Sequence, residues 1–427
     1  MAVKIERVVG WEALDSRGRP TVACSVFVAG GFSGTATVPS GASTGTHEAI
    51  ELRDGGTRYG GKGVRDAVAA VNGEIAGALI GRDAGAQRAI DDVLRELDGT
   101  PNLGRLGANA VLAASIACAL AAADALRCPL WRMLDPDGVP LLPLPMVNVI
   151  SGGAHAGSLI DIQDVLVVPV GASSFAQAIE WAVKVRGATA DVLRDAGLQV
   201  DLVADEGGLA GALKSNRAAI EAVAAGIEAS GLGLGDDAAI AVDLAATQFF
   251  DGRNYQLACE GRTLTAAELV AEIRSWCDAL PIVSVEDPLA DDDWEGWAIA
   301  SRELTERQLV GDDLFVTAKA RLAEGIAAGI ANAVLVKPNQ VGTLSDALRV
   351  VETAREANYA TVLSARSGET EDAWLADLAV GWRTAQLKVG STTRSERTVK
   401  WNRLLRLEAE EKETSFAGRE ALAPLGR

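Results

Sequence analysis

From residue 140 onward the sequence alternates between short apolar runs and longer amphipathic stretches, and this rhythm constrains the fold most strongly. The apolar runs lie near 143–150, 165–170, 199–204, 239–243, 282–286, 308–311, 333–336, 360–364 and 385–388. The stretches between them predict helices and include 174–196, 216–229, 266–279, 344–357 and 371–382. Alternating strands and helices imply right-handed crossovers and a parallel sheet. Roughly eight strands favour a closed β/α barrel, with an open doubly wound sheet as the alternative.

The residues before this rhythm follow a different pattern. The first 35 residues read as strands, and helices are predicted near 63–80 and 84–97. Small and turn-forming residues over 38–47 predict an exposed loop. The turn cluster Asp135-Pro136-Asp137-Gly138 then marks a boundary. Since a chain of 427 residues is long enough for two or three domains, we divide it into 1–135 and 140–427.

Most of the apolar runs end on a charged residue. Acidic residues follow the earlier runs, namely Asp205 and Glu206, Asp243, Glu286 and Asp287, and Asp312 and Asp313. Basic residues follow the later ones, namely Lys337, Arg366 and Lys388. A single acid at such a position is usually a helix cap or a turn residue. The ends of parallel strands meet at one mouth of a barrel, however, so we expect these charges to gather around one site.

Carboxylates gathered in this way repel one another unless a cation neutralises them. Oxygen ligands favour Mg²⁺, and a chain with two histidines has no His-rich metal site to offer. We take Asp243, Glu286 and Asp312 as the metal ligands. A lysine near the cation, Lys337, would remove a proton α to a carboxylate, and Glu206 would protonate a leaving hydroxyl. The chemistry predicted is β-elimination of water from a 2-substituted 3-hydroxy acid.

The composition limits the class of binding partner and the cellular compartment that we expect for this protein. The formal charge is −18, which argues against nucleic-acid binding and means that an anionic substrate needs local cations. The five cysteines are scattered and form no C-x-x-C pair, as suits a reducing compartment. The N-terminus lacks the apolar core of a signal peptide, and the uncharged stretch 106–123 is alanine-rich, which favours a buried helix over a membrane span. We expect a cytoplasmic protein with no membrane partner.

Several long motifs resemble the enolase family, in the same order and over essentially the whole chain. They are DSRGRPTV at 15–22, PSGASTGTHEAIELRD at 39–54, GANAVLAASIA at 107–117, DEGG at 205–208, SVEDPL at 284–289, LVGDDLFVT at 309–317, VKPNQVGTL at 336–344 and RSGETEDAWLADLAVG at 366–381. The resemblance implies a small N-terminal α+β domain with a mobile loop at 38–47. It also implies a C-terminal TIM-like barrel whose first strands depart from strict alternation, and a homodimer or larger assembly.

The resemblance also implies roles for individual residues. Asp243, Glu286 and Asp312 match the Mg²⁺ ligands, and Ser43 matches a ligand of a second Mg²⁺ that joins with the substrate. Lys337 matches the general base and Glu206 the general acid. The residues that match groups around the substrate are Lys388, Arg366, Ser367, Gln163 and His155.

Two positions depart from the family pattern. Ala365 stands where the family has a histidine, and Asp164 stands where it has a catalytic-site glutamate. We keep Asp164 and His155 among the catalytic candidates and Ala365 among the substrate contacts. The loss of the histidine empties volume beside the phosphoryl site, which would suit a bulkier group on the C2 oxygen.

The reaction expected from the resemblance converts a 2-phosphoglycerate-type substrate into phosphoenolpyruvate or an analogue. One alternative is a specialised homologue from phosphonate biosynthesis that forms carboxyphosphonoenolpyruvate from a carboxyphosphono-glycerate. Another is a non-catalytic, enolase-like scaffold. In both catalytic cases the partner is a small anionic phosphorylated or phosphono compound.

Overall fold

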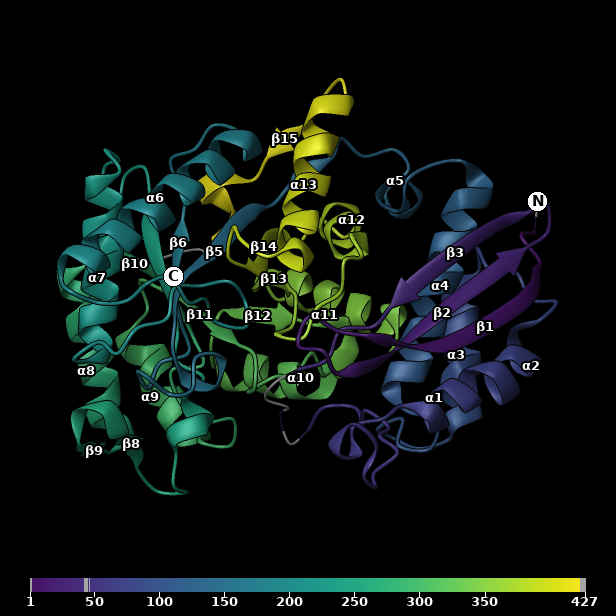
Figure 1. The fold of residues 1–427 in the computed structure, drawn as a ribbon, viewed down its shortest axis with the longest axis horizontal. Helices are drawn as coiled ribbons and strands as arrows, with labels where there is room; N and C mark the ends of the chain where they lie inside the picture. Colours follow the sequence, from purple (N-terminus) through teal and green to yellow (C-terminus); the bar gives the residue numbers. More distant parts are fainter. Residues whose placement is uncertain (1, 42–44, 46, 423–427) are drawn as a thin grey trace.

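The computed structural model describes residues 2–41, 45 and 47–422. Its N-terminal part is an antiparallel sheet in the order β1-β2-β3, covered by helices (Figure 1). The strands are β1 (Ile5–Leu14), β2 (Pro20–Val28) and β3 (Phe32–Thr37). The helices are α1 (Arg65–Ala70), α2 (Ala76–Leu79), α3 (Gln87–Asp98), α4 (Ala108–Leu126) and α5 (Leu130–Leu134), with a π-helical turn, η2 (Val71–Ile75), between α1 and α2.

Helix α4 forms the core of this part, as its alanine-rich sequence predicts. It is long and apolar enough to cross a membrane by length and composition, but most of its residues are buried against β2, β3 and α3. Small side chains let the helix approach the sheet closely. A Cβ atom added to Gly34 of β3 would lie 2.2 Å from the backbone nitrogen of Ala121 and 2.3 Å from the carbonyl oxygen of Ala117.

Replacing Gly34 with alanine is therefore expected to destabilise the protein by about 1–3 kcal/mol, because the methyl group forces α4 away from the sheet. Urea unfolding checks the value. Gly187, in the exposed middle of helix α6 (Phe175–Asp195), is the matched control because an added Cβ meets nothing within 4 Å. Gly187→Ala should stabilise by about 0.5–1 kcal/mol, and equal effects at both sites would contradict the close-packing account.

The C-terminal part is a closed barrel, which confirms the predicted fold class. In the order around the barrel, its strands are β10 (Ile282–Glu286), β11 (Gln308–Gly311), β12 (Ala333–Val336), β13 (Ala360–Ser364), β14 (Ala385–Gly390), β5 (Leu144–Ser151), β6 (Asp164–Val168) and β7 (Ala239–Asp243). Around them lie α6, α7 (Asn216–Ala229), α8 (Ala266–Ala279), α9 (Trp294–Glu303), α10 (Lys319–Ala328), α11 (Leu344–Glu356), α12 (Trp374–Gly381) and α13 (Ser395–Glu410) (Figure 1).

Short elements complete the chain. The pairs β4 (Leu141–Leu142) with β15 (Ser415–Phe416) and β8 (Tyr255–Leu257) with β9 (Arg262–Leu264) form two small sheets. Single 3-10 turns are η1 (Arg58–Gly61), η3 (Gly153–His155), η4 (Ala246–Phe249), η5 (Ala258–Glu260), η6 (Pro338–Gln340) and η7 (Gly418–Ala421).

The expectation of a fully parallel sheet is wrong at β6. This strand runs antiparallel to both neighbours, and Asp164 at its beginning pairs with Ser151 and Asp243 at the ends of β5 and β7. No long helix lies between β5 and β6 to return the chain for a parallel pairing, whereas two packed helices, α6 and α7, separate β6 from β7. Because of this reversal, the beginning of β6 lies at the same rim as the ends of the other strands.

The predicted strand at 199–204 is also wrong. These residues form a loop between α6 and α7, where Leu202 is 68% exposed and Val203 is 41% exposed. Val200 and Ala204 are buried, but the run forms no ladder: its bridge is the isolated one between Val203 and Leu209. Glu206 therefore follows a loop instead of a strand end.

The start of the segment 38–47 contacts the barrel part of the chain. Contrary to the expected exposure, Val38 and Ser40 are buried. The backbone of Ser40 exchanges two hydrogen bonds with Gly368, at 2.8 and 2.9 Å, and Arg17 donates to the carbonyl oxygens of Ser40 and Gly41. These bonds hold the start of the segment beside the loop that follows β13. Ser43 lies outside the described residues.

Candidate active site

A polar cavity lies at the rim where the barrel strands end. Its lining residues come from the N-terminal part and from many barrel strands and loops: Glu48, His155, Gln163, Glu206, Asp313, Lys337, Ser364, Ala365, Arg366, Ser367 and Lys388. The structure therefore brings together charged side chains that follow β12 and β13 with Lys388, which lies within β14 near its end.

Two lysines in this cavity contact the three carboxylates proposed as metal ligands. Lys388 Nζ lies 2.6 Å from Asp243 Oδ2 and 2.8 Å from each carboxylate oxygen of Glu286. Lys337 Nζ donates to Asp312 Oδ2. All five side chains are buried or nearly so. Two ammonium groups thus offset part of the negative charge of three buried carboxylates.

The charges in this cluster shift one another strongly. Burial raises the pKa of Glu286 well above its ordinary value, and the negative charge of Asp243 raises it further. Burial lowers the pKa of Lys388, but attraction to Asp243 and Glu286 outweighs this and raises it well above the usual range. Burial also lowers the pKa of Lys337. The attraction to Asp312 outweighs this effect, so the pKa of Lys337 is raised as well.

The donor set fits a hard divalent cation. Its members offer only carboxylate oxygens, and Asp243 Oδ1 is buried with no hydrogen-bond partner among the described residues. Asp312 also belongs to a group with Asp287 and Asp313 whose oxygens lie within 4.8 Å of one another. Asp287, however, accepts the backbone N–H groups of Asp312 and Asp313, at 3.0 and 2.7 Å, so it shapes the turn after β11.

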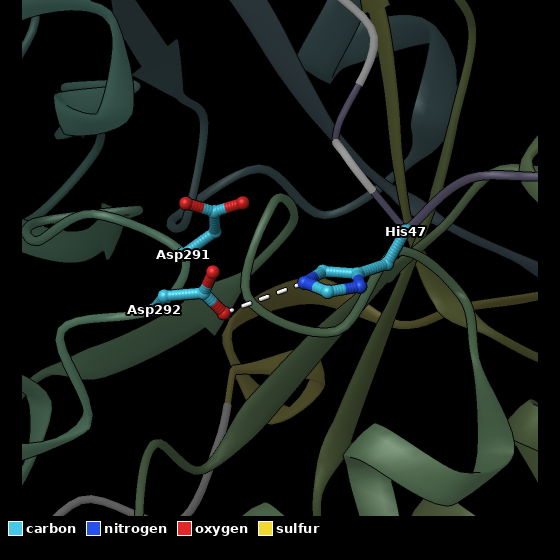
Figure 2. A group of neighbouring side chains, drawn as sticks. All are labelled: His47, Asp291 and Asp292. Carbon is cyan, nitrogen blue, oxygen red and sulfur yellow. Dashed lines mark hydrogen bonds and ion pairs between the residues drawn. The ribbon is translucent and has the colours of Figure 1, made fainter.

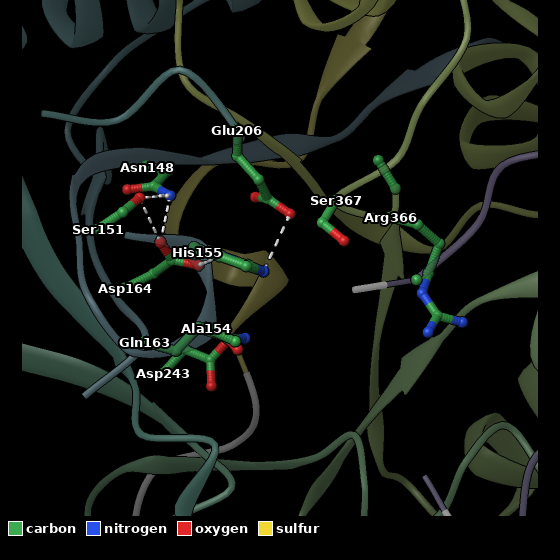
Figure 3. Close-up of polar contacts among 12 residues, drawn as sticks. Asn148, Ser151, Ala154, His155, Gln163, Asp164, Glu206, Asp243, Arg366 and Ser367 are labelled. Atoms are coloured by element: carbon green, nitrogen blue, oxygen red, sulfur yellow. Dashed lines mark hydrogen bonds and ion pairs between the residues drawn. The ribbon is translucent and has the colours of Figure 1, made fainter. Parts of the chain in front are cut away.

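His155 forms the opposite side of the cavity together with two carboxylates (Figure 3). Its Nδ1 lies 3.0 Å from Asp164 Oδ2, and its Nε2 lies 3.8 Å from Glu206 Oε1. The other Asp164 oxygen accepts hydrogen bonds from Asn148 and from Ser151 Oγ, the latter at 2.8 Å. Asp164 has no exposed surface and is not among the residues that line the cavity.

Gln163, the neighbour of Asp164, connects this side to the carboxylate cluster. Its Nε2 donates to Asp243 Oδ2 at 3.0 Å, and its Oε1 accepts from Gln248 Nε2 at 2.6 Å. Gln248 also accepts the backbone N–H of Ala154, which holds the turn that carries His155. Sequence reasoning did not single out Gln248, because an amide in a 3-10 turn carries no local signal of its partners.

Arg366 carries the positive charge at a third side of the cavity. Its guanidinium lies 3.0 Å from Glu48 Oε2 and 3.0 Å from Asn339 Oδ1. Buried Arg397 donates to the carbonyl oxygens of Arg366 and Ser367 and so orients this segment. Glu48 and Asn339 were not among the predicted site residues, although both lie within the motifs quoted above.

One further histidine lies outside the cavity. His47 Nε2 points toward Asp292 Oδ1 at 3.4 Å, with Asp291 beside it (Figure 2). The side chains of His47 and Asp292 are 39% and 67% exposed, so water screens this pair.

The closed barrel, the N-terminal sheet with its helices and the charged rim define a barrel protein with a polar site at its strand ends. Residues 5–134 match the family model "Enolase, N-terminal domain", and residues 140–425 match "Enolase, C-terminal TIM barrel domain". The chain belongs to the enolase family, whose members generally bind Mg²⁺. The resemblance stated from the motifs is thus confirmed.

Proposed function

We propose that the protein is a Mg²⁺-dependent hydro-lyase that removes water from a 2-phosphoglycerate-type substrate to give phosphoenolpyruvate or an analogue. The observation that supports this most is that Lys337 and Lys388 both line the cavity and contact the buried carboxylates Asp312, Asp243 and Glu286. Such a set offers a base, a carboxylate-binding cation and an oxygen cage for metal within reach of one small anion.

The metal residues in this proposal are Asp243, Glu286 and Asp312, with Ser43 as a ligand of a second ion. When bound, Mg²⁺ would stabilise the negative charge that develops on the substrate carboxylate after C2 loses its proton. Lys388 would bind that carboxylate, and Arg366 with Ser367 would hold the phosphoryl oxygens.

Lys337 is the proposed base at C2. Its attraction to Asp312 now raises its pKa, while burial and the positive charge of Arg366 lower it. Once Asp312 is engaged as a metal ligand, the lowering effects remain and a neutral amine becomes accessible. By family resemblance, Glu206 is the acid for the leaving hydroxyl. We further propose a cytoplasmic homodimer or larger assembly.

A second candidate is the specialised reaction that yields carboxyphosphonoenolpyruvate. The observation that favours it is Ala365, which lines the cavity beside Arg366 and Ser367 where the family has a histidine. The absence of the histidine side chain, together with an Asp164 that is one methylene shorter than the family's glutamate, would suit a C2 group that carries an additional carboxyl.

The two substrates can be compared directly. If the cavity is built for the larger group, kcat/KM for the carboxyphosphono-glycerate should exceed that for 2-phosphoglycerate by about tenfold or more, since a lost fit is worth about 1–3 kcal/mol. Ala365→His should reduce turnover of the larger substrate and spare the smaller one. Equal turnover of the larger substrate before and after this substitution would remove the reason for the specialised assignment. Mg²⁺ binding without hydrogen exchange at C2 of either substrate would instead favour the scaffold.

A further inference from the structure

The carboxylate of Asp312 is part of a closed ring of hydrogen bonds. Lys337 donates to this ring twice, from Nζ to Asp312 Oδ2 and from its backbone N–H to Thr317 Oγ1, the latter at 2.8 Å. Gln340 closes the ring, with its Nε2 3.0 Å from Asp312 Oδ1 and its Oε1 2.5 Å from Thr317 Oγ1. Thr317 and Gln340 are buried, and neither lines the cavity at the barrel rim. Any effect of these two residues on a reaction therefore runs through Asp312 and Lys337.

The direction of each hydrogen bond in the ring follows from what its atoms can donate. An ionised carboxylate only accepts, so the amide nitrogen of Gln340 faces Asp312 and the amide oxygen faces Thr317. The Thr317 hydroxyl gives its single proton to that oxygen, and its lone pair accepts the backbone N–H of Lys337. Turning the amide over would place its oxygen against the carboxylate. The ring thus has one orientation, in which Gln340 occupies Oδ1 of Asp312 and Oδ2 is left for Lys337.

The turn that carries Thr317 has a strained backbone. It begins at Asp312, whose carbonyl oxygen accepts the backbone N–H of Val316 at 2.7 Å. Val316 and Thr317 have φ angles of 42° and 54°, in the left-handed region that β-branched residues rarely occupy. Such conformations persist where the surrounding contacts hold them, and they gather at functional sites. The two hydrogen bonds of the Thr317 hydroxyl are contacts of this kind, so the hydroxyl holds the turn in a conformation that its residues do not favour.

The turn that carries Gln340 is held by the N-terminal part of the chain. The carbonyl oxygen of Gln340 accepts the backbone N–H of Ala49 at 2.8 Å, and its Nε2 also lies 3.4 Å from Glu48 Oε1. Glu48 is in turn paired with Arg366 at 3.0 Å. Because both its backbone and its side chain are held, the amide of Gln340 has little freedom to move away from Asp312.

We propose, resting on the dehydration assigned above, that Thr317 and Gln340 are positioning residues that set the orientation of the Asp312 carboxylate. Gln340 occupies Oδ1, which leaves Oδ2 for Lys337 in this structure and for a bound Mg²⁺. Thr317 ties the backbone of Lys337 to the same ring, so the proposed base and the proposed metal ligand keep one relative position. Replacing a residue that orients a metal ligand from behind typically changes metal affinity or activity by about 10- to 100-fold.

Thr317→Val and Thr317→Ser test the role of the hydroxyl. Valine keeps the shape and the branch at Cβ but loses both hydrogen bonds, whereas serine keeps the hydroxyl. Thr317→Val should weaken Mg²⁺ binding and lower kcat at saturating Mg²⁺, each by about 10- to 100-fold. The KM for the substrate should change much less, because the side chains proposed to hold the substrate, Arg366 and Lys388, are intact. Thr317→Ser should retain most of the wild-type kcat and Mg²⁺ affinity.

Gln340→Met removes the amide from the other side of the ring at nearly constant volume, and it should weaken Mg²⁺ binding to a similar extent. Thr189→Val is the matched control. Thr189 is fully buried on α6, and its hydroxyl donates to the carbonyl oxygen of Val185 at 2.8 Å. This control loses a buried hydroxyl of the same kind and should leave kcat and Mg²⁺ affinity unchanged. Calorimetry measures the Mg²⁺ affinity, and urea unfolding in a chelator measures stability separately.

These measurements separate a positioning role from a purely structural one. Thr317→Val and Gln340→Met proteins that are less stable in urea but keep the wild-type kcat and Mg²⁺ affinity would overturn the proposal. A Thr317→Ser protein as impaired as Thr317→Val would also overturn it. If the wild type neither removes water nor exchanges the C2 hydrogen, the proposed function fails. The Mg²⁺ titrations then decide the positioning roles alone, because they need no substrate: weaker binding in both variants supports these roles, and unchanged binding overturns them.

Discussion

Replacing Lys337 with methionine is expected to lower kcat by about 10²- to 10⁴-fold and to abolish exchange of the C2 hydrogen with D2O. Methionine keeps most of the volume of the side chain, while the amine that would accept the proton is gone. Asp312 loses its ammonium partner, so Mg²⁺ binding should be retained or strengthened. Rapid-quench turnover, C2 exchange followed by NMR and Mg²⁺ titration by calorimetry measure the three quantities.

The matched control for Lys337→Met is Lys184→Met on α6. Lys184 is half exposed and pairs with Glu180 at 2.6 Å on the outer surface of the barrel, far from any proposed role. The Lys184→Met substitution should leave kcat and the exchange of the C2 hydrogen unchanged. Persistent C2 exchange in Lys337→Met at the wild-type rate would rule out Lys337 as the base while leaving the metal assignment standing.

Replacing Lys388 with methionine should affect both activity and stability. The substitution leaves Asp243 and Glu286 buried without their shared cation, and the loss of one partner of a buried pair costs about 3–5 kcal/mol. Denaturant unfolding in a chelator should show this loss, whereas saturating Mg²⁺ should recover much of it, because a cation bound to the folded state alone stabilises it. Dehydration should be lost under both conditions, since the proposed substrate carboxylate has no partner.

The recovery by Mg²⁺ is the decisive part of the Lys388 experiment. Ca²⁺ serves as a second oxygen-binding cation, and Lys184→Met again provides the surface control. Equal destabilisation of Lys388→Met with and without Mg²⁺ would mean that Asp243 and Glu286 do not form the metal cage.

The positions of the charged residues were predictable where a strand carries them. Asp243, Glu286, Lys337 and Lys388 lie at or near the ends of barrel strands, and strand periodicity together with the barrel rule brings them to one rim. Their pairing with one another follows from burial and charge. Local sequence was sufficient for these residues because the ends of parallel barrel strands all lie at the same rim.

The reversed strand and the role of Asp164 were not predictable in the same way. The direction of β6 depends on whether a helix returns the chain, and an apolar run at 165–170 carries no sign of direction. The motif comparison shows that Asp164 is shorter than the family residue. It does not show that the carboxylate turns to His155, since that depends on Asn148 and Ser151 across the hairpin. Glu48 was missed because its partner, Arg366, is distant in sequence.

The hairpin of β5 and β6 has a practical consequence for redesign. Its connecting segment brings His155 and Gln163 to the cavity, whereas Glu286 and Asp312 come from the ends of β10 and β11. Gln163 contacts Asp243 of the carboxylate cluster, but the proposed metal ligands Glu286 and Asp312 are carried by other stretches of chain than the hairpin loop. A library can therefore vary the hairpin loop and the turn around Ala365 while Glu286, Asp312, Lys337 and Lys388 stay unchanged. Such a library would be selected for substrates with new leaving groups or new groups on the C2 oxygen.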